Sequence, residues 1–335
     1  MNLNYVKEIA KWMQSDRPVV EVREELLNYH DRDIAFAIES LDGAARKKAF
    51  QILDEERLAD VFSYFKDPLE YMDEIGMERF AAIVSDMDSD DAVDVLEELD
   101  DATRKRLAPL LQADARKAIR LIRSYDEDEI GSQMTTNFVR ISQGISVKQA
   151  TRSLILQADK NDNINTIYVS DGERHYVGAI DLKDLITARE YDDLEDIIVS
   201  SYPYVFAEEK IDACVDKIKE YAEDSIPVLD EERRIVGVIT ATDITELVDE
   251  EMGEDYAMLA GMTEASDLDE TTFQSMKKRL PWLILLLFLG MGVSSVVGLF
   301  EQVVAQVALI VCFQSLILDM AGNVGTQSLA VTIRI

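Results

Sequence analysis

Twenty consecutive uncharged residues, Pro281 to Phe300, place the strongest constraint on how this chain can fold. As a helix they would span about 30 Å, the thickness of the hydrocarbon core of a bilayer. Lys277, Lys278 and Arg279 come directly before them. Basic residues favour the cytoplasmic side of a membrane. We therefore expect an integral membrane protein whose long N-terminal part lies in the cytoplasm.

A second uncharged run extends from Gln302 to Leu318. The residues that follow it are polar, although a membrane-spanning helix would still be in hydrocarbon there. The next stretch, LDMAGNVGTQSLA, contains a carboxylate, an asparagine and two glycines. At about 1.5 Å per residue, Asp319 lies roughly 24 Å into a span that starts near Val303. A turn at the membrane edge is the alternative, but it leaves the largely apolar residues 328–333 without a purpose. We expect an opened backbone that lines a polar cavity, and an ionisable residue with a function.

Residues 1–132 have a helical pattern with a recurring motif. An apolar residue followed by Asp returns after twelve residues in two places, Leu41-Asp42 to Leu53-Asp54 and Met87-Asp88 to Leu99-Asp100. Each Asp is predicted to be the N-cap of a short helix of about three turns. Because repeated short helices stack on one another, we expect an all-α superhelical N-domain. A generic helical domain is the alternative.

Two later segments, INTIYVSDGERHYVGAIDLKDL and EDSIPVLDEERRIVGVITATDI, align at an offset of 59 residues. Gly178 matches Gly237, and Asp184 matches Asp243. Each segment is predicted to form a strand, a turn, a second strand and a helix. This pattern resembles the CBS domain, which occurs in tandem, and the expected α+β pair occupies residues 133–188 and 197–250.

The resemblance to CBS pairs implies a bound adenine nucleotide, such as ATP. In that family the ribose is contacted by an Asp that follows a Ser or Thr by three residues. Thr240 and Asp243 of the second repeat fit this pattern. The first repeat has Asp181 and Asp184, where the acid replaces the hydroxyl and would repel phosphate. We expect nucleotide at one site only; the alternative is that Asp184 and Asp243 cap helices.

The chain is strongly acidic, with 66 acidic and 34 basic residues and a net charge of −32. This balance argues against nucleic acid as a partner, because phosphate binding needs a basic stripe and none is evident. Between Asp243 and Glu270 there are eleven acidic residues and no Lys or Arg. A helix of this composition repels itself. Either it is a solvated linker, or divalent cations such as Mg2+ supply the missing charge.

The order of these parts resembles the MgtE family of magnesium transporters. The parts are the helical N-domain, the tandem CBS pair, a long acidic connecting helix over 251–276 and an α-helical transmembrane segment over 280–335. The family fingerprint corresponds here to Gly322, Asn323, Gly325 and Gln327, and Asp319 adds a carboxylate near the predicted pore.

The resemblance implies a homodimeric, Mg2+-selective channel of the cell membrane with five transmembrane helices per subunit. Mg2+ would be both its substrate and its regulator, and the lipid bilayer its environment. The chain carries the first two of these helices, so we expect the regulatory part and first third of the pore of a longer, multi-pass transporter with a cytoplasmic N-terminus. The family's ion-site carboxylate on the last helix would lie outside these residues.

Carboxylates from three surfaces are predicted to converge on Mg2+ and close the pore when the ion is abundant. These predicted regulatory ligands are Glu55, Asp88 and Asp91 in the N-domain, Glu220, Glu223 and Asp224 in the second CBS repeat, and Asp249, Glu250, Glu254 and Asp255 in the connecting helix. Since Mg2+ keeps several waters, each ion needs only one or two of them.

Two alternative functions stay open. One is the transport of Mn2+, Co2+ or Ca2+, and the other is a membrane-tethered, nucleotide-sensing CBS regulator. An enzyme is not expected, because the sequence shows no nucleophile–base pair, Walker-type loop or cluster of metal ligands.

Overall fold

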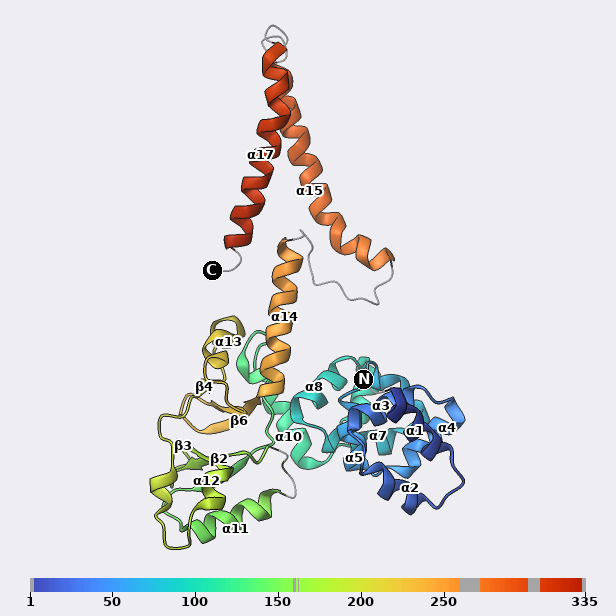
Figure 1. Ribbon diagram of the computed structural model, residues 1–335, viewed down its shortest axis with the longest axis vertical. Coiled ribbons are helices and arrows are strands. Elements are labelled where there is room, and N and C mark those ends of the chain that lie inside the picture. Colours follow the sequence, from blue (N-terminus) through green and yellow to red (C-terminus); the bar gives the residue numbers. More distant parts are fainter. Residues whose placement is uncertain (1–2, 159–160, 162, 260–271, 301–307, 333–335) are drawn as a thin grey trace. The chain divides into compact units, whose positions relative to one another are not determined.

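The computed structural model describes residues 3–158, 161, 163–259, 272–300 and 308–332 of the chain (Figure 1). The chain divides into two compact units, Met1–Ile244 and Thr245–Ile335. The first unit contains the predicted N-domain and CBS pair, and the second contains most of helix α14 and the apolar helices.

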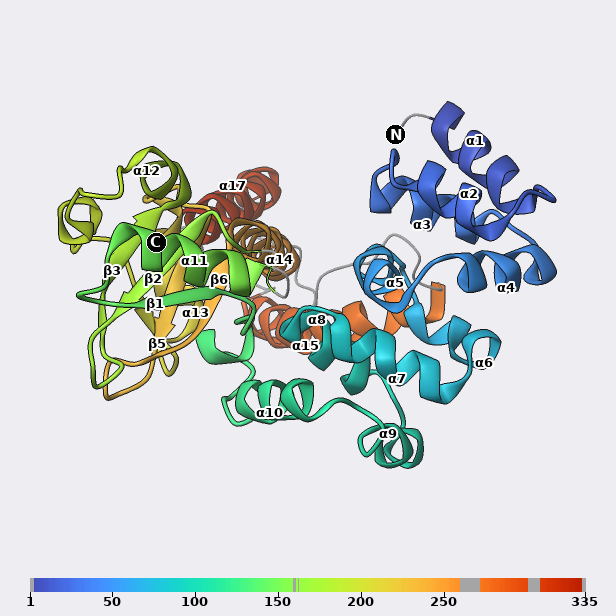
Figure 2. The same ribbon diagram turned by 90° about the horizontal axis from the view of Figure 1, so that it is seen from below.

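Short helices build the N-domain, and they follow one another along a curved path (Figure 2). Their bounds are α1 (Leu3–Gln14), α2 (Val19–Leu26), α3 (Asp31–Glu39), α4 (Gly43–Ile52), α5 (Glu55–Phe62), η1 (Pro68–Tyr71), α6 (Met72–Ile75), α7 (Met77–Asp86), α8 (Ser89–Glu97), α9 (Asp101–Leu107) and α10 (Ala113–Ile122). Helices one or two places apart in sequence pack together, including α1 with α3, α5 with α7, and α8 with α10. The prediction of an all-α superhelical N-domain is confirmed.

Aspartates start three of these helices as predicted. The side chains of Asp42, Asp54 and Asp100 accept hydrogen bonds from backbone N–H groups in the first turns of α4, α5 and α9. The position of the fourth aspartate, Asp88, is also as predicted. It stands at the N-cap of α8 but makes no side-chain capping bond; its Oδ1 instead accepts a 2.7 Å hydrogen bond from Asn137 Nδ2.

The CBS pair consists of two repeats, each with a three-stranded sheet, in the orders β1-β2-β3 and β4-β5-β6. The first repeat contains β1 (Val139–Ser142), α11 (Val147–Ala158), β2 (Thr166–Ser170), β3 (Tyr176–Asp181) and α12 (Leu182–Thr187), and the second contains β4 (Val205–Phe206), α13 (Ile211–Lys219), β5 (Ser225–Leu229), β6 (Ile235–Thr240) and the start of α14 (Ala241–Leu259). The 3-10 helices η2 (Ile130–Ser132) and η3 (Leu194–Ile197) precede the repeats. In both sheets the first two strands are parallel and the last two antiparallel. The predicted order of strand, turn, strand and helix is confirmed.

The matching glycines of the two repeats sit where another segment passes close to the sheet. A Cβ on Gly178 would lie 2.6 Å from the carbonyl oxygen of Val199, in the segment leading to the second repeat. A Cβ on Gly237 would lie 2.8 Å from the carbonyl oxygen of Thr135, in the segment leading to the first. Each glycine therefore lets the lead-in to the other repeat pack against its strand.

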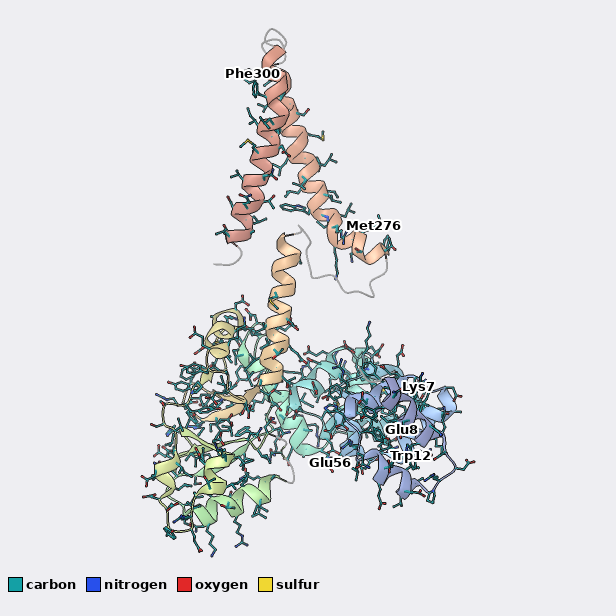
Figure 3. All side chains as sticks on the ribbon, viewed as in Figure 1. Lys7, Glu8, Trp12, Glu56, Met276 and Phe300 are labelled. Atoms are coloured by element: carbon teal, nitrogen blue, oxygen red, sulfur yellow. The ribbon has the colours of Figure 1, made fainter. Side chains whose placement is uncertain are left out.

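The second unit contains the remainder of α14 and two long helices, α15 (Thr272–Leu299) and α17 (Ala308–Thr332). Among the described residues, Ser275–Leu299 is the one helix long and apolar enough to cross a membrane, with a mean hydropathy of 2.3. Met276 and Phe300 mark its two ends in Figure 3. Residues 260–271, part of the predicted connecting helix, lie outside the described residues.

The expectation of an opened backbone in the polar stretch after Leu318 is wrong. Helix α17 continues through Asp319, Gly322 and Asn323 to Thr332, and Thr326 Oγ1 donates a 3.0 Å hydrogen bond to the carbonyl of Gly322. A glycine costs a helix only about 1 kcal/mol. Opening the backbone in an apolar medium leaves several peptide groups unsatisfied at several kcal/mol each, so the helix is preferred.

Candidate functional site

The acidic first turn of α8 is held against the lead-in to the first CBS repeat. Asn137 Nδ2 donates to Asp88 Oδ1 at 2.7 Å. Two residues earlier, Thr135 exchanges two backbone hydrogen bonds of 2.9 Å with Val238 of β6. Strand β6 leads directly into α14, whose first turn carries Asp243. These bonds therefore position carboxylates of the N-domain relative to a carboxylate of the second CBS repeat.

Asp90 is the centre of this carboxylate group, which we define as Asp88, Asp90, Asp91 and Asp243. The residue is half-buried, but its Oδ1 is enclosed and has no hydrogen-bond partner in the described chain. Desolvation, and then the charges of Asp243, Asp91 and Asp88, raise the pKa of Asp90 to about 8. An enclosed carboxyl among like charges is unfavourable when ionised, so the group gains stability from a cation or a proton.

Asp91 lies on the side of this group that faces α5. Its Oδ2 accepts a 2.6 Å hydrogen bond from Ser63 Oγ. Desolvation raises the pKa of Asp91 above its ordinary value, and the hydrogen bond from Ser63 opposes this effect. Asp88 and Asp91, both predicted as regulatory ligands, thus lie at the same end of α8.

The predicted ligands of the second CBS repeat lie in and beside the loop between α13 and β5. The N–H of Ala241 donates to the carbonyl of Asp224 at 2.9 Å, so this loop lies beside the first turn of α14. Asp224 Oδ2 accepts a 3.1 Å bond from Asn165 Nδ2. The Tyr202 hydroxyl donates a 2.7 Å hydrogen bond to the carbonyl of Ser225. Desolvation raises the pKa of Tyr202, and the charge of Glu223 adds to this effect. Glu220 is exposed at the C-cap of α13.

Glu55 has a different set of partners from the carboxylate group. Its Oε1 accepts a 2.9 Å bond from Arg79 Nε, and this bond lowers the pKa of Glu55. The same guanidinium donates to the carbonyls of Phe50 and Leu53 at 2.7 and 2.8 Å. Glu55 therefore orients an arginine that fastens the end of α4 to α7.

The ligands predicted in the connecting helix are positioned only in part. Asp249 is exposed on α14. The backbones of Glu250, Glu254 and Asp255 belong to that helix, but their side chains lie outside the described residues.

Among the described side chains, no group of three or more His, Cys, Asp or Glu residues could hold a metal ion as it stands. Mg2+ commonly keeps several waters and takes only one or two protein carboxylates. The chemistry of the carboxylate group therefore fits a hydrated hard cation better than a fully protein-ligated one.

The residues predicted to contact a nucleotide form a capping box at the start of α14. The Thr240 N–H donates to Asp243 Oδ2 at 2.8 Å, and the Asp243 N–H donates to Thr240 Oγ1 at 3.3 Å. The capping alternative is thus confirmed for Asp243. In the first repeat it is wrong for Asp184, because the side chain of Asp181 caps α12 by accepting from the N–H of Lys183 at 2.7 Å.

The predicted pore residues all lie on α17 and are exposed. Asp319, Asn323 and Gln327 recur every four residues, so they follow one face of the helix. Gly322 and Gly325 have no atom within 4 Å of the position of a Cβ. These polar side chains are therefore carried by a regular helix.

Known proteins match these parts of the chain. The family model of the MgtE intracellular N domain matches residues 29–128, and the CBS domain matches residues 128–191 and 194–250. The magnesium transporter MgtE of Bacillus subtilis is 30% identical over 304 residues, which are 90% of this chain and 67% of that relative. The chain belongs to the MgtE family. An MgtE protein of Enterococcus faecalis is 37% identical over 210 residues, which are 63% of this chain and 46% of that relative. The chain thus spans about half to two thirds of the length of these curated relatives.

Two solved MgtE-type structures resemble the first part of the chain. The soluble part of a magnesium transporter has a TM-score of 0.68 and 28% identity, and the match covers 74% of this chain and 98% of that one. The cytosolic domain of the Mg2+ channel MgtE in complex with ATP has a TM-score of 0.61 and 28% identity, with 69% and 95% covered. These similarities confirm the predicted family and fold class.

Sequence reasoning missed the central residue of the carboxylate group in this MgtE chain. Asp90 stands between predicted ligands in the stretch MDSDDA, but nothing local indicates that its Oδ1 is enclosed. The missed partners Thr135 and Asn137 lie in the lead-in to the first repeat. The recurrence of a glycine at position 237 was a signal that another backbone segment passes close to this strand. In the structure that segment contains Thr135.

Proposed function

We propose that this chain is the regulatory part and the first portion of the pore of a Mg2+ channel of the cell membrane, which closes when intracellular Mg2+ is abundant. The observation that carries this proposal is the carboxylate group, in which Asp88, Asp90 and Asp91 of the N-domain meet Asp243 of the second CBS repeat. The names of the MgtE relatives support magnesium as the ion.

The carboxylate group suits a sensor because its ionised form opposes the contact on which it lies. Two unit charges 4 Å apart repel by about 4 kcal/mol at the effective dielectric of a protein surface. A hydrated Mg2+ between the two domains would replace this repulsion by attraction. Sites of about millimolar affinity, worth about 4 kcal/mol each, can together bias a two-state element strongly.

Further ions would extend this effect toward the membrane. We assign them to Glu220, Glu223 and Asp224 beside the first turn of α14, and to Asp249, Glu250, Glu254 and Asp255 farther along that helix. Asp224 supports the first assignment, because its backbone is hydrogen-bonded to the start of α14. Glu55 is the weakest candidate, since Arg79 already pairs with its carboxylate.

The pore portion is proposed to be multi-pass and dimeric, with the N-terminus in the cytoplasm. Asp319, Asn323 and Gln327 on one face of α17 would line the path of the ion. Small residues recur every four positions along α15, with Ser294 midway between Gly290 and Gly298. A Cβ added to either glycine would have no atom within 4 Å, which suits close packing with a helix of a second copy.

Limited trypsin digestion of the 335-residue chain in neutral detergent tests the sensor. Raising Mg2+ through the millimolar range should slow cleavage at Arg123 and Arg140, which flank the lead-in to the first repeat. Asp90→Asn should weaken this protection, whereas Asp114→Asn, the same change at an exposed site, should not. Equal cleavage with and without Mg2+ contradicts the proposal. Parallel titrations with Mn2+, Co2+ and Ca2+ determine which ion is preferred.

A nucleotide is a second proposed ligand, supported by the ATP complex of the MgtE cytosolic domain. We place it at Thr240 and Asp243. ATP titrated without Mg2+ should bind the wild-type chain, and Thr240→Val should weaken this binding. If ATP alone protects the chain and Mg2+ does not, a nucleotide-sensing regulator becomes the better description.

A further inference from the structure

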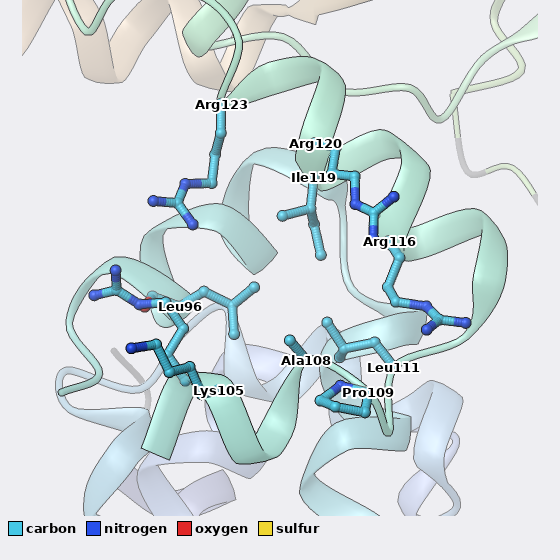
Figure 4. A pocket seen from close by; sticks show the side chains of 10 residues that line it. Leu96, Lys105, Ala108, Pro109, Leu111, Arg116, Ile119, Arg120 and Arg123 are labelled. Atoms are coloured by element: carbon cyan, nitrogen blue, oxygen red, sulfur yellow. The ribbon is translucent and has the colours of Figure 1, made fainter. Parts of the chain in front are cut away.

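A pocket in the N-domain has no role in the proposed sensor. It is a cavity of about 540 Å³ bounded by the end of α8 and by α9 and α10. Leu96, Leu111 and Ile119 are buried and supply an apolar floor. Figure 4 shows Leu96 and Ile119 pointing toward its middle, while Lys105, Arg116 and Arg120 lie around its edge.

The lining of this pocket is basic in a chain that is otherwise acidic. Five cationic side chains line it and no carboxylate does: Arg104, Lys105, Arg116, Arg120 and Arg123. Residues 100–123 contain seven basic and three acidic residues, whereas the whole chain has a net charge of −32. The composition of the whole chain showed no basic stripe, but the fold gathers basic side chains around this pocket.

These cations fall into two groups. Arg104 is fixed by hydrogen bonds of 2.8 and 2.7 Å to the carbonyls of Leu96 and Leu99, and Arg123 lies 3.6 Å from Glu97. The side chains of Lys105, Arg116 and Arg120 have no hydrogen-bond or ion-pair partner within the described part of the chain. Three unengaged cations thus surround an apolar floor.

We propose that this pocket binds an organic phosphate, with its phosphoryl group between Lys105, Arg116 and Arg120 and its apolar body on Leu111 and Ile119. Guanidinium groups match the oxygens of a phosphate in bidentate geometry. The volume is within the usual range for small ligands, and such sites combine an apolar lining with a few polar groups. A bare anion would leave the apolar floor exposed to water, and an uncharged apolar ligand would leave the three cations without a partner.

The test uses 1-naphthyl phosphate as the probe, on the 335-residue chain in neutral detergent, because this probe lacks the adenine expected at the CBS pair. Inorganic phosphate and 1-naphthol, which correspond to the phosphate and the aromatic part of the probe, are each tested alone. Short-chain phosphatidic acid below its micellar concentration represents a lipid headgroup, and the matching phosphatidylcholine is its control.

Two double variants change the net charge by the same amount, one at residues that line the pocket and one at residues that do not. Lys105→Glu with Arg120→Glu changes one lining residue on each of α9 and α10. Arg106→Glu with Lys117→Glu makes the same change on the same helices at residues that do not line the pocket. Circular dichroism and urea unfolding verify that both variants fold.

The wild-type chain should bind 1-naphthyl phosphate saturably and more tightly than either half. The pocket variant should bind at least tenfold more weakly, about 1.4 kcal/mol, and the off-pocket variant should stay within about threefold of wild type. If phosphatidic acid binds and 1-naphthyl phosphate does not, and the pocket variant again binds more weakly than the off-pocket variant, the natural phosphate is a lipid headgroup. Equal losses in both variants, or no saturable binding of either phosphate, overturn the proposal.

Discussion

Replacing Asp90 by Asn should stabilise the N-domain at neutral pH and reduce its sensitivity to pH. Burial and three neighbouring carboxylates raise the pKa of Asp90 from 3.8 to about 8. Between these values the carboxyl is protonated in the folded protein and ionised in the unfolded one. The folded state then binds more protons, so the free energy of unfolding falls as the pH rises through this window.

The magnitude follows from the same shift. At pH 7 the unfolded carboxyl is roughly three pH units above its pKa while the folded one stays protonated. At about 1.4 kcal/mol per unit, the raised pKa of Asp90 lowers the free energy of unfolding by about 4 kcal/mol at pH 7. An amide at this position carries no such cost. Coupling spreads the titration over the whole carboxylate group, so we expect Asp90→Asn to raise the free energy of unfolding at pH 7 by about 2 kcal/mol.

Tryptophan fluorescence can follow this unfolding in the whole chain. The chain has two tryptophans, so Trp282→Phe leaves Trp12, on α1 of the N-domain, as the reporter (Figure 3). Urea unfolding is measured without Mg2+ at pH 5 and pH 7, for wild type, Asp90→Asn and the exposed control Asp114→Asn. The free energy should fall with pH in wild type and the control, and fall less in Asp90→Asn. Equal slopes in all three would mean that folded Asp90 is ionised, and would refute the reasoning.

Four further predictions concern other parts of the molecule. Arg79→Ala removes two bonds to backbone carbonyls and should lower the free energy of unfolding by about 1–3 kcal/mol in the same urea assay; Arg79→Lys should lose less, and no loss would contradict the structural role. Gly237→Ala brings a Cβ to 2.8 Å from the carbonyl of Thr135 and should speed hydrogen exchange of the Thr135 amide. In the full-length transporter, Asn323→Ala should reduce Mg2+ uptake far more than Leu316→Ala, and equal rescue of a transport-deficient strain in low Mg2+ would exclude the pore role. Sedimentation in detergent should show a dimer at micromolar concentration, and monomer alone would contradict the proposed assembly.

Several features of the fold could be predicted because their causes are local. Asp42, Asp54 and Asp100 cap helices through N–H groups two or three residues away, so a short motif suffices to predict them. Gly178 and Gly237 recur at one spacing because the two repeats are similar units, and in each a backbone segment passes close to the same position of the second strand of the predicted pair. The apolar composition of 281–300 alone predicts a long helix, although α15 begins nine residues earlier, at Thr272.

The candidate site was predicted only in part, because its properties depend on distant residues. Asp88 and Asp91 were predicted from the sequence as cation ligands, but the pKa of Asp90 is raised in part by Asp243, which lies 153 residues later in the chain. Asp88 is the N-cap residue that was predicted, but its side chain makes no capping bond and accepts a hydrogen bond from Asn137, 49 residues later in the chain. Charges far apart in sequence interact only once packing brings them together and removes water.

By itself, the sequence determined the order of the N-domain, the CBS repeats and the apolar segment, and the starts of four helices in the N-domain, since periodicity and capping act within one or two turns. Only the tertiary structure decided that the polar stretch of α17 stays helical, that Asp90 Oδ1 is enclosed, and that the basic residues of 100–123 surround one apolar pocket. Composition averages charge over the whole chain, whereas binding depends on the few side chains that folding places around one volume.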